Sequence, residues 1–280
     1  MAVSTSRSVN IDRVTTIRVD GPGDPRMHDF VAVSDAELLQ ARGLFVAEGR
    51  LVVERLIGDR RWRLHSMLLS DAAHRALQGP LAQVAARIPI YLCQPDDFAG
   101  ITGYNFHRGC LALVERPDAL AVETVVDEAR TVVVLEAVAN ADNVGGVFRN
   151  AAAFGVDAVL LGPTSCDPLY RKAIRTSMAG VLRVPFARTA DVPALLQLLH
   201  ACGFTVVALS PREPAVELET FARAPRPARL AIVVGAEGAG LSAAIEAGAD
   251  VRVRIPIAPQ IDSLNLATAT GIALYRLSRM

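Results

Sequence analysis

Short blocks of apolar residues recur along this chain and predict strands and helices in alternation. In the first part, runs with the length and apolar content of strands lie at 44–49, 64–70, 88–93 and 110–117. Helical patterns stand between them, and the one that follows Ser34 has Glu37 at the spacing of a capping box. This alternation predicts a parallel or mixed α/β layer.

The apolar runs of the second part are nearly continuous. They lie at 131–138, 157–162, 180–186, 204–210, 230–236 and 251–257. Helical patterns separate several of them, at 145–155, 171–180, 191–203 and 264–279. Near-continuous apolar strands predict a parallel sheet that is covered on both faces.

The composition divides the chain into four stretches. Residues 1–26 are mostly polar and predict an arm, although the segment 13–19 could add an edge strand. Residues 27–117 form the first predicted α/β unit, and the acidic, proline-containing stretch 118–130 predicts a linker. Residues 131–280 form the second predicted unit.

The overall composition narrows the class of protein. Of the 280 residues, 51% are hydrophobic and 21% are charged, which is typical of a globular protein and excludes a disordered chain. The net charge is zero, so only local basic patches can argue for nucleic acid. The four cysteines are far apart and lack zinc-type spacing, which predicts a reduced, cytoplasmic protein without a metal site. We expect no signal peptide, because the N-terminus has no apolar h-region. We expect no membrane span, because no apolar run approaches about 18 residues.

Several common catalytic motifs are absent from the sequence. There is no phosphate-binding G-x-x-x-x-G-K-[ST] loop, and no G-x-G-x-x-G follows the strand at 131–138. There is also no G-x-S-x-G and no H-E-x-x-H. Hydride transfer and serine hydrolysis therefore start with little support.

Three segments are more polar or richer in glycine than their positions in an α/β fold require. The first follows the strand at 131–138, where Asn143 stands at the expected start of a helix and is a good N-cap. Gly145 and Gly146 allow a close backbone approach, and Arg149 follows in a helix otherwise rich in Val, Phe and Ala. Alone, this pattern is more typical of a capped core helix with one solvated arginine.

The other two segments also follow predicted strands. One runs into Gly235 and places Glu237 in a glycine-rich turn, where open α/β sheets bind ligands, and Ser242 could cap the next helix. The other carries Ser263 and Asn265 just before a helix rich in Ala and Thr. Each is also typical of an ordinary turn or a capped helix.

Together the three segments resemble the signature motifs of the SpoU–TrmH branch of the SPOUT methyltransferases, over about 150 residues. The first motif, N-x-x-N-x-G-x-x-x-R-x-A, is filled by Asn140, Asn143, Gly145, Arg149 and Ala151. The second, G-x-E-x-x-G-[LI]-S, is filled by Gly235, Glu237, Gly240, Leu241 and Ser242. The third, I-P-x(6)-S-L-N, is filled by Ile255, Pro256, Ser263, Leu264 and Asn265. The run after Asn265 departs from the family's usual one but keeps small residues.

The resemblance implies a SPOUT domain with a parallel sheet and a deep trefoil knot. It further implies that the domain binds S-adenosylmethionine and methylates a ribose 2′-hydroxyl of RNA. The implied reaction centre comprises Asn143, Arg149, Glu237, Ser263 and Asn265. The implied cofactor contacts are Leu209, Gly235, Ile255 and Leu264. A homodimer is also implied, and the Ala/Leu/Ile face expected on the terminal helix supports it.

Methyl transfer from a sulfonium needs an oxygen nucleophile in line with the methyl carbon and an acceptor for its proton. Arg149 is the family's candidate acceptor, but a guanidinium stays protonated at neutral pH and is a poor base. Three roles stay open: Arg149 clamps a phosphate or the developing alkoxide, Arg149 is a perturbed base, or water is the base. We expect Ser263 and Asn265 to orient the ribose or the arginine, and Glu237 to hold Arg149 or Asn143.

The first unit resembles the ribosomal-protein-L30e-like substrate-binding domain that is often fused before this catalytic domain. Its stretches LFVAEGRLVVERL and NFHRGCLALVERP match that domain's recurring motifs. The resemblance favours RNA phosphate binding by an arginine cluster that is otherwise typical of a solvated helix end. This cluster comprises Arg55, Arg60, Arg61 and Arg63. In the second unit, further RNA contacts are predicted for Arg171, Lys172 and Arg175.

The leading hypothesis is an RNA 2′-O-ribose methyltransferase, acting on ribosomal RNA or, second, on transfer RNA. The alternative is an RNA- or ribosome-binding protein that has lost catalysis, and the intact reaction-centre residues argue against it. A nucleotide-binding oxidoreductase is a third possibility, against which the missing dinucleotide fingerprint argues.

Overall fold

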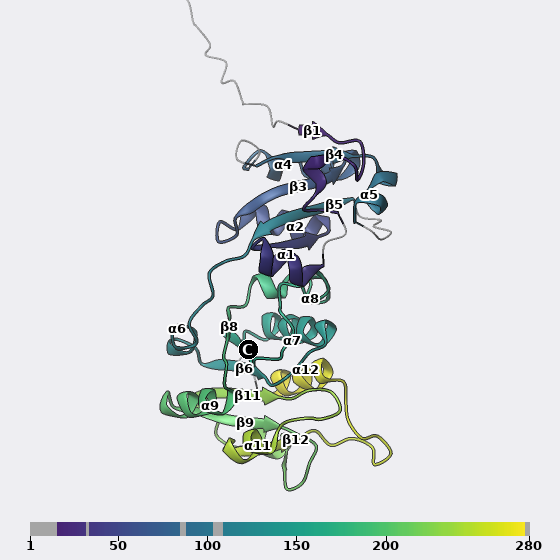
Figure 1. Ribbon diagram of the computed structural model, residues 1–280. Coiled ribbons are helices and arrows are strands. Elements are labelled where there is room, and N and C mark those ends of the chain that lie inside the picture. Colours follow the sequence, from purple (N-terminus) through teal and green to yellow (C-terminus); the bar gives the residue numbers. More distant parts are fainter. Residues whose placement is uncertain (1–15, 32–33, 85–87, 103–108, 278–280) are drawn as a thin grey trace, which may run out of the picture. The chain divides into compact units, whose positions relative to one another are not determined.

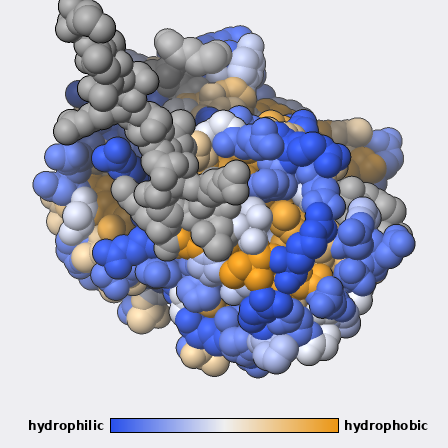
Figure 2. Space-filling view, turned by 90° about the horizontal axis from the view of Figure 1, so that it is seen from above, coloured by the Kyte–Doolittle hydropathy of each residue, from blue (hydrophilic) through white to orange (hydrophobic). Residues whose placement is uncertain are grey.

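The computed structural model describes residues 16–31, 34–84, 88–102 and 109–277 (Figure 1). The chain forms two compact units, Met1–Arg116 and Pro117–Met280. The visible face in Figure 2 carries mostly hydrophilic residues with hydrophobic ones between them, as is usual for a folded surface. None of the described helices combines the length and apolarity that a bilayer span requires.

The first unit is built on a mixed five-stranded sheet in the order β1-β4-β3-β5-β2. Strands β1, β4 and β3 are parallel, and β5 is antiparallel to both β3 and β2. The strands are β1 Thr16–Arg18, β2 Leu44–Glu48, β3 Leu64–Ser70, β4 Ile90–Cys93 and β5 Cys110–Glu115. The helices are η1 Pro25–Met27, α1 Asp35–Ala41, α2 Arg50–Gly58, α3 Asp71–Ala76, α4 Gln78–Leu81 and α5 Pro95–Thr102.

Local signals predicted strands β2 to β5 and helices α1 and α2 of this unit but not α3, α4 and α5. The capping residue of α1 is an example of such a signal. The Ser34 hydroxyl accepts a hydrogen bond from the N–H of Glu37 at 3.2 Å. The edge strand expected within 13–19 forms as β1, which pairs with β4 at the edge of the sheet. Val19 is 4% exposed, so the stretch 1–26 is not an arm throughout. Burying these residues removes apolar surface from water, so the first unit includes them. Residues 1–15 lie outside the described part of the chain.

The second unit contains a seven-stranded sheet in the order β10-β12-β9-β11-β6-β7-β8, and every pairing in it is parallel. The strands are β6 Thr131–Leu135, β7 Ala158–Leu161, β8 Phe186–Arg188, β9 Phe204–Leu209, β10 Val216–Glu217, β11 Arg229–Val234 and β12 Val251–Arg254. The helices are α6 Val122–Asp127, α7 Ala141–Ala153, α8 Arg171–Thr176, η2 Gly180–Leu182, α9 Val192–Ala201, α10 Leu218–Arg223, α11 Ala243–Gly248 and α12 Leu266–Leu277. The parallel sheet expected from the sequence is thus confirmed.

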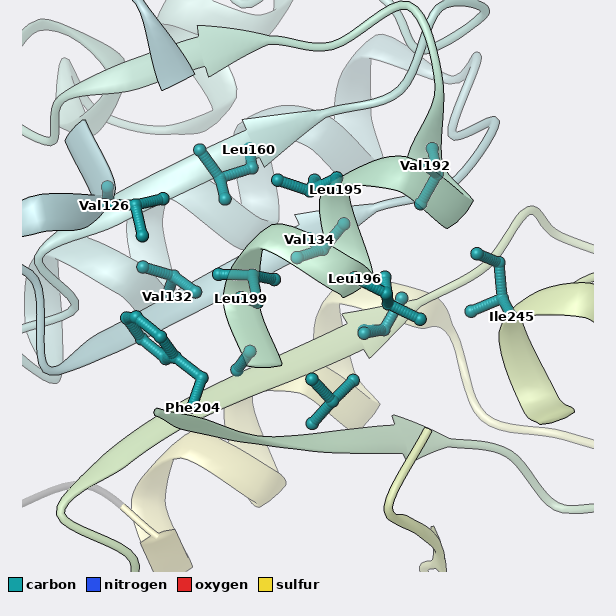
Figure 3. Close-up of a cluster of buried hydrophobic side chains, with 14 of the residues drawn as sticks. Val126, Val132, Val134, Leu160, Val192, Leu195, Leu196, Leu199, Phe204 and Ile245 are labelled. Atoms are coloured by element: carbon teal, nitrogen blue, oxygen red, sulfur yellow. The ribbon is translucent and has the colours of Figure 1, made fainter. Parts of the chain in front are cut away.

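Helices α6, α9 and α11 cover one face of this sheet, and Figure 3 shows the side chains that meet there. Leu195, Leu196 and Leu199 of α9 pack in a buried cluster with Val132 and Val134 of β6. Helices α7 and α12 lie on the other side of the sheet (Figure 1). Apolar residues on both faces explain why these strands have almost no polar positions.

The stretch 118–130, which the sequence predicts as a linker, contains helix α6. Val126 and Ala129 are 0% and 3% exposed and belong to the core cluster beneath α9. The stretch therefore belongs to the second unit, because its apolar residues pack against the sheet.

The sequence predicted a strand over the apolar run 180–186, but the structure does not form one there. Gly180–Leu182 forms a 3-10 turn, and the strand begins only at Phe186. Met178 and Ala179 have φ angles of 51° and 65°, so the chain turns sharply here. A Cβ on Gly180 would lie 2.8 Å from the carbonyl oxygen of Phe148, so the turn is pressed against α7.

Candidate active site

A cavity of about 590 Å³ lies at the carboxyl ends of β9, β11 and β12. The loops that follow these strands line it, which is where open parallel sheets bind ligands. All of the predicted cofactor contacts lie on its wall, namely Leu209, Gly235, Ile255 and Leu264. Three of the predicted polar residues do so as well, namely Glu237, Ser263 and Asn265.

The loop after β11 folds back on itself, and this requires a glycine at position 235. A Cβ on Gly235 would collide with the backbone of Gly240. The N–H of Gly240 donates to the carbonyl of Ala236 at 2.9 Å, which closes the turn. The turn places Glu237 at the cavity with an exposed side chain.

The far end of this loop is anchored by Ser242. Its hydroxyl accepts from the N–H of Ile245 at 3.4 Å and so caps α11, as expected. Its own N–H and hydroxyl donate to the two carboxylate oxygens of Glu136, at 2.9 and 2.6 Å. Glu136 directly follows β6, so the ends of β6 and β11 are tied together there.

Asn265 joins two of the other predicted polar residues, Asn143 and Glu237. Its Nδ2 donates to Oδ1 of Asn143 at 2.9 Å and, at a longer 3.5 Å, to Oε1 of Glu237. Its Oδ1 accepts from the backbone N–H of Thr268 at 3.2 Å and so caps α12. We expected Glu237 to hold Arg149 or Asn143, but Asn265 is the residue that bonds to Glu237 and Asn143.

The N-cap of α7 is Asn140, and not Asn143 as the sequence suggested. The Asn140 side chain accepts from the N–H of Asp142 at 2.8 Å, so the helix starts earlier than expected. Asn143 therefore lies inside the helix, only 3% exposed, where its amide is available to Asn265. Its Nδ2 is buried without a hydrogen-bond partner among the described residues.

Arg149 lines a second cavity, of about 570 Å³, between α7 and α12. Its side chain is exposed and forms no hydrogen bond or ion pair with the described residues. Thr268 lines the same cavity and bonds to Asn265 through its N–H and, at 3.4 Å, its hydroxyl. Asn265 on the wall of the first cavity and Thr268 on the wall of the second are thus joined by hydrogen bonds at the start of α12.

Helices α7 and α12 are in close contact beside Arg149, where their residues line the second cavity. A Cβ on Gly146 would lie 2.5 Å from the Cβ of Ala267, so the two helices touch at this glycine. Asn150 Nδ2 donates to the carbonyl of Ala267 at 2.7 Å. The first motif contains Gly145 but not Gly146. The close packing of α7 on α12 therefore explains why position 146 is also a glycine.

Some of the basic side chains predicted to contact RNA already have acidic partners. Lys172 Nζ lies 2.7 Å from Asp142, and this hydrogen bond is the main reason that the pKa of Asp142 is lowered. Arg61 pairs with Asp59 at 2.6 Å and lowers the pKa of that carboxyl. Arg63 Nη1 also lies 3.9 Å from Glu115 Oε2. Together with these residues, Arg55, Arg60, Arg171 and Arg175 are spread over exposed and half-buried surface of both units.

The cavity at the strand ends, which the predicted cofactor contacts line, is called the cofactor-side cavity. Sequence reasoning missed Ser210 and Arg212, which line it, and Glu136 and Glu246, which bond to residues beside it. Ser210 and Arg212 follow β9, and Glu136 follows β6, so their positions at strand ends were a usable signal. Glu246 lies within α11, and no local pattern in the sequence marks it. Within the described residues, no group of three or more His, Cys, Asp or Glu side chains is arranged to hold a metal ion.

Comparison with protein families matches residues 130–275 to the model of the SpoU rRNA Methylase family. A protein of Mycobacterium tuberculosis called an uncharacterized tRNA/rRNA methyltransferase is 42% identical over 262 residues. The match covers 92% of this chain and 90% of that protein.

A characterised relative and a solved structure extend the comparison. The 23S rRNA (guanosine(2553)-2′-O)-methyltransferase RlmP of Bacillus subtilis is 31% identical over 192 residues, covering 68% of this chain and 73% of that protein. The AdoMet-bound rRNA methyltransferase from Sinorhizobium meliloti superposes with a TM-score of 0.80 at 24% identity, covering 94% of this chain and 97% of that one. This likeness shows that the two chains share a fold over nearly their whole length.

Proposed function

The chain belongs to the SpoU rRNA methylase family of RNA methyltransferases, and from this we propose that it methylates a ribose 2′-hydroxyl of RNA. S-adenosylmethionine is the methyl donor. One observation carries the proposal: residues of the second and third motifs line one cavity at the strand ends. Asn265 of the third motif also bonds to Asn143 of the first motif. The 2′-O activity in the name of the Bacillus subtilis relative supports the ribose as acceptor, with ribosomal RNA first and transfer RNA second.

The described residues fit S-adenosylmethionine. The cavity has the size of a small-molecule site and is walled by apolar side chains and loop backbone. The carboxylates of Glu237 and Asp262 stand on its wall, where they complement the positive sulfonium and ammonium groups. Leu209, Gly235, Ile255 and Leu264 would hold the adenosine portion by packing and by backbone hydrogen bonds.

S-adenosylmethionine supplies an electrophilic methyl group on a sulfonium when it is bound. The chain's own residues must then bring the ribose oxygen in line with it and stabilise the alkoxide that develops. Arg149 has an exposed guanidinium without a partner among the described residues, which suits a clamp on phosphate or alkoxide oxygen. Asn143 and Asn265 hold the first turns of α7 and α12 together, which positions Arg149 relative to the cofactor cavity.

We also propose that the C-terminal segment forms the deep trefoil knot implied by the family resemblance. The placement of α12 supports it: β12 pairs with β9 and β10 on one side of β11, whereas α12 packs on α7, which follows β6 on the other side. The loop 255–265 between them must return across the loop after β11. The first unit is proposed as an L30e-like domain that binds RNA through its exposed arginines, and the family resemblance of its motifs supports this.

A homodimer through α7 and α12 is part of the proposal. Ile272 and Tyr275 of α12 are 37% and 57% exposed and line the Arg149 cavity, which leaves an apolar face uncovered. Light scattering at micromolar concentration is expected to give twice the chain mass, and Tyr275→Glu to give a single chain mass. A wild-type monomer would contradict the dimer.

The test of the function combines binding with transfer. Purified protein should bind S-adenosylmethionine in calorimetry and then transfer labelled methyl groups to RNA from cells that lack the gene. The modified nucleotide should resist alkaline cleavage, because a 2′-O-methyl group blocks attack by the ribose oxygen. Methylation of a base would refute the ribose as acceptor. Cofactor binding without transfer to any RNA would support the inactive RNA-binding alternative.

A further inference from the structure

We propose that Arg212 is a positioning residue for the cofactor cavity, because it ties the loop after β9 to the loop after β11. The inference rests on the proposed function, since it assigns Arg212 a role in binding S-adenosylmethionine. Arg212 stands on the wall formed after β9, and the turn of the second motif forms the facing wall. Neither the motifs nor the predicted cofactor contacts include it.

The arginine crosses between the two walls by hydrogen bonds to main-chain oxygens. Its Nη2 donates to the carbonyl of Ala239 at 2.7 Å, and its Nη1 donates to the carbonyl of Leu241 at 3.2 Å. A planar guanidinium can reach two carbonyls at once with fixed geometry, whereas a lysine ammonium is a point charge on a flexible stem. The two hydrogen bonds therefore fix the position of the turn as well as its distance from β9.

The turn that Arg212 holds needs such support. Gly238 and Gly240 have φ angles of 79° and 71°, a conformation that glycine adopts freely and that leaves the backbone with many alternatives. On one side the turn continues to Ser242, which Glu136 anchors. Arg212 supplies an anchor from the other side, and a turn that is already ordered binds its ligand at a smaller entropic cost.

Glu246 of α11 in turn fixes the arginine. Its Oε1 accepts from the hydroxyl of Ser210 at 2.8 Å and lies 3.7 Å from Arg212 Nη1, and its Oε2 lies 3.7 Å from Arg252. The Glu246 side chain is only 10% exposed, so these partners offset the cost of burying its charge. Ser210 also accepts from the N–H of Arg212 at 3.3 Å, which holds the start of the loop.

The test measures S-adenosylmethionine binding by calorimetry and methyl transfer to RNA at saturating cofactor. In Arg212→Gln, we expect the Kd to rise about tenfold, because two charge-assisted hydrogen bonds are removed, and kcat to stay within about threefold. Arg212→Lys should not restore full affinity, because it lacks the two-pronged donor. Glu246→Gln keeps the acceptor for Ser210 and should give a smaller rise in Kd.

Arg229→Gln is the matched control. Arg229 also donates to main-chain oxygens, which include those of Ala129 and Cys202 at 2.9 and 2.8 Å, but it does so at the amino end of β11. Its replacement should lower the melting temperature and leave the Kd unchanged. A second readout, hydrogen exchange of the amides at 236–242 in the free protein, should speed up in Arg212→Gln and not in Arg229→Gln.

The outcomes separate the two proposals. Wild-type protein that does not bind the cofactor would overturn the proposed function, and with it the role of Arg212. Normal wild-type binding with an unchanged Kd in Arg212→Gln would overturn the role of Arg212 alone. A fall in kcat as large as the rise in Kd would also overturn it, because Arg212 would then act in the chemistry.

Discussion

Arg149 extends an exposed guanidinium from α7 into the cavity between α7 and α12, apart from the loops that line the cofactor-side cavity. This separation makes its role testable by itself. Arg149→Ala is expected to lower methyl transfer at least about 100-fold, because the developing charge is left without its stabilising partner. Cofactor affinity should stay within a few-fold, since Arg149 does not line the cofactor-side cavity. Calorimetry and single-turnover transfer measure the two quantities.

The control for this change is Arg149→Lys, which keeps the charge and removes the planar donor. We expect partial activity if charge alone stabilises the alkoxide and almost none if a two-pronged donor is needed. Near-normal turnover by Arg149→Ala would remove Arg149 from the mechanism.

Asn265 has two roles that a pair of substitutions can separate. Asn265→Ala removes the cap of α12 and should cost about 1 kcal/mol of unfolding free energy as well as activity. Asn265→Asp keeps the capping oxygen but replaces the Nδ2 donor to Asn143 with an acceptor. The new carboxylate also faces Glu237, so we expect a small loss of stability, less than in Asn265→Ala, and little activity in Asn265→Asp, measured by urea unfolding and methyl transfer. Equal activity in the aspartate variant and the wild type would show that the hydrogen bond to Asn143 is not needed.

At the scale of elements, the packing of α7 on α12 supports the site. Gly146→Ala would place a methyl group 2.5 Å from the Cβ of Ala267, which forces the two helices apart. We expect the unfolding free energy to fall by about 1–3 kcal/mol from overpacking, measured in urea, with reduced methyl transfer.

Gly248→Ala serves as the control in the same unit. A Cβ at the end of α11 would meet only Leu196 Cδ2, at 3.4 Å, and the backbone there has no positive φ. Its effect on unfolding free energy should stay below about 1 kcal/mol. If the unfolding free energy fell by similar amounts in the two variants, the contact between α7 and α12 at Gly146 would not be the cause of the loss.

At the scale of the whole molecule, the two units allow binding to RNA to be separated from binding to the cofactor. A fragment 117–280 retains α6, whose Val126 is fully buried, and contains all three motifs. It should fold and bind S-adenosylmethionine but bind RNA more weakly than the full chain. The slope of log affinity against log salt should flatten by about one unit at most for each RNA phosphate that the fragment no longer neutralises.

The control for the fragment is a full-length chain with a neutralised arginine cluster. In this variant Arg55, Arg60, Arg61 and Arg63 are replaced by Gln. Its salt dependence should decrease by a similar amount without truncation, measured on one RNA at several salt concentrations. Identical affinities and slopes for wild type, variant and fragment would show that the first unit does not bind RNA.

The order and type of most elements, and the family, could be predicted from the amino-acid sequence without any structure. Apolar periodicity is a local property, so runs such as 131–138 and 204–210 predicted the strands they form. The motifs also predicted the positions of Gly235, directly after β11, and of Asn265, directly before α12. Their spacing predicted a common site before any atomic distance between them was known.

Which of these residues touch became known only from the folded chain. Asn143 rather than Asn140 looked like the cap of α7, because the two amides have the same chemistry and the start of the helix depends on its packing. The stretch 118–130 looked like a linker, because only its packing against the sheet shows that Val126 is buried. Arg212 and Glu246 are far apart in the sequence and meet only because the loop after β9 lies against α11. Such pairs depend on elements that are distant along the chain, so no local pattern encodes them.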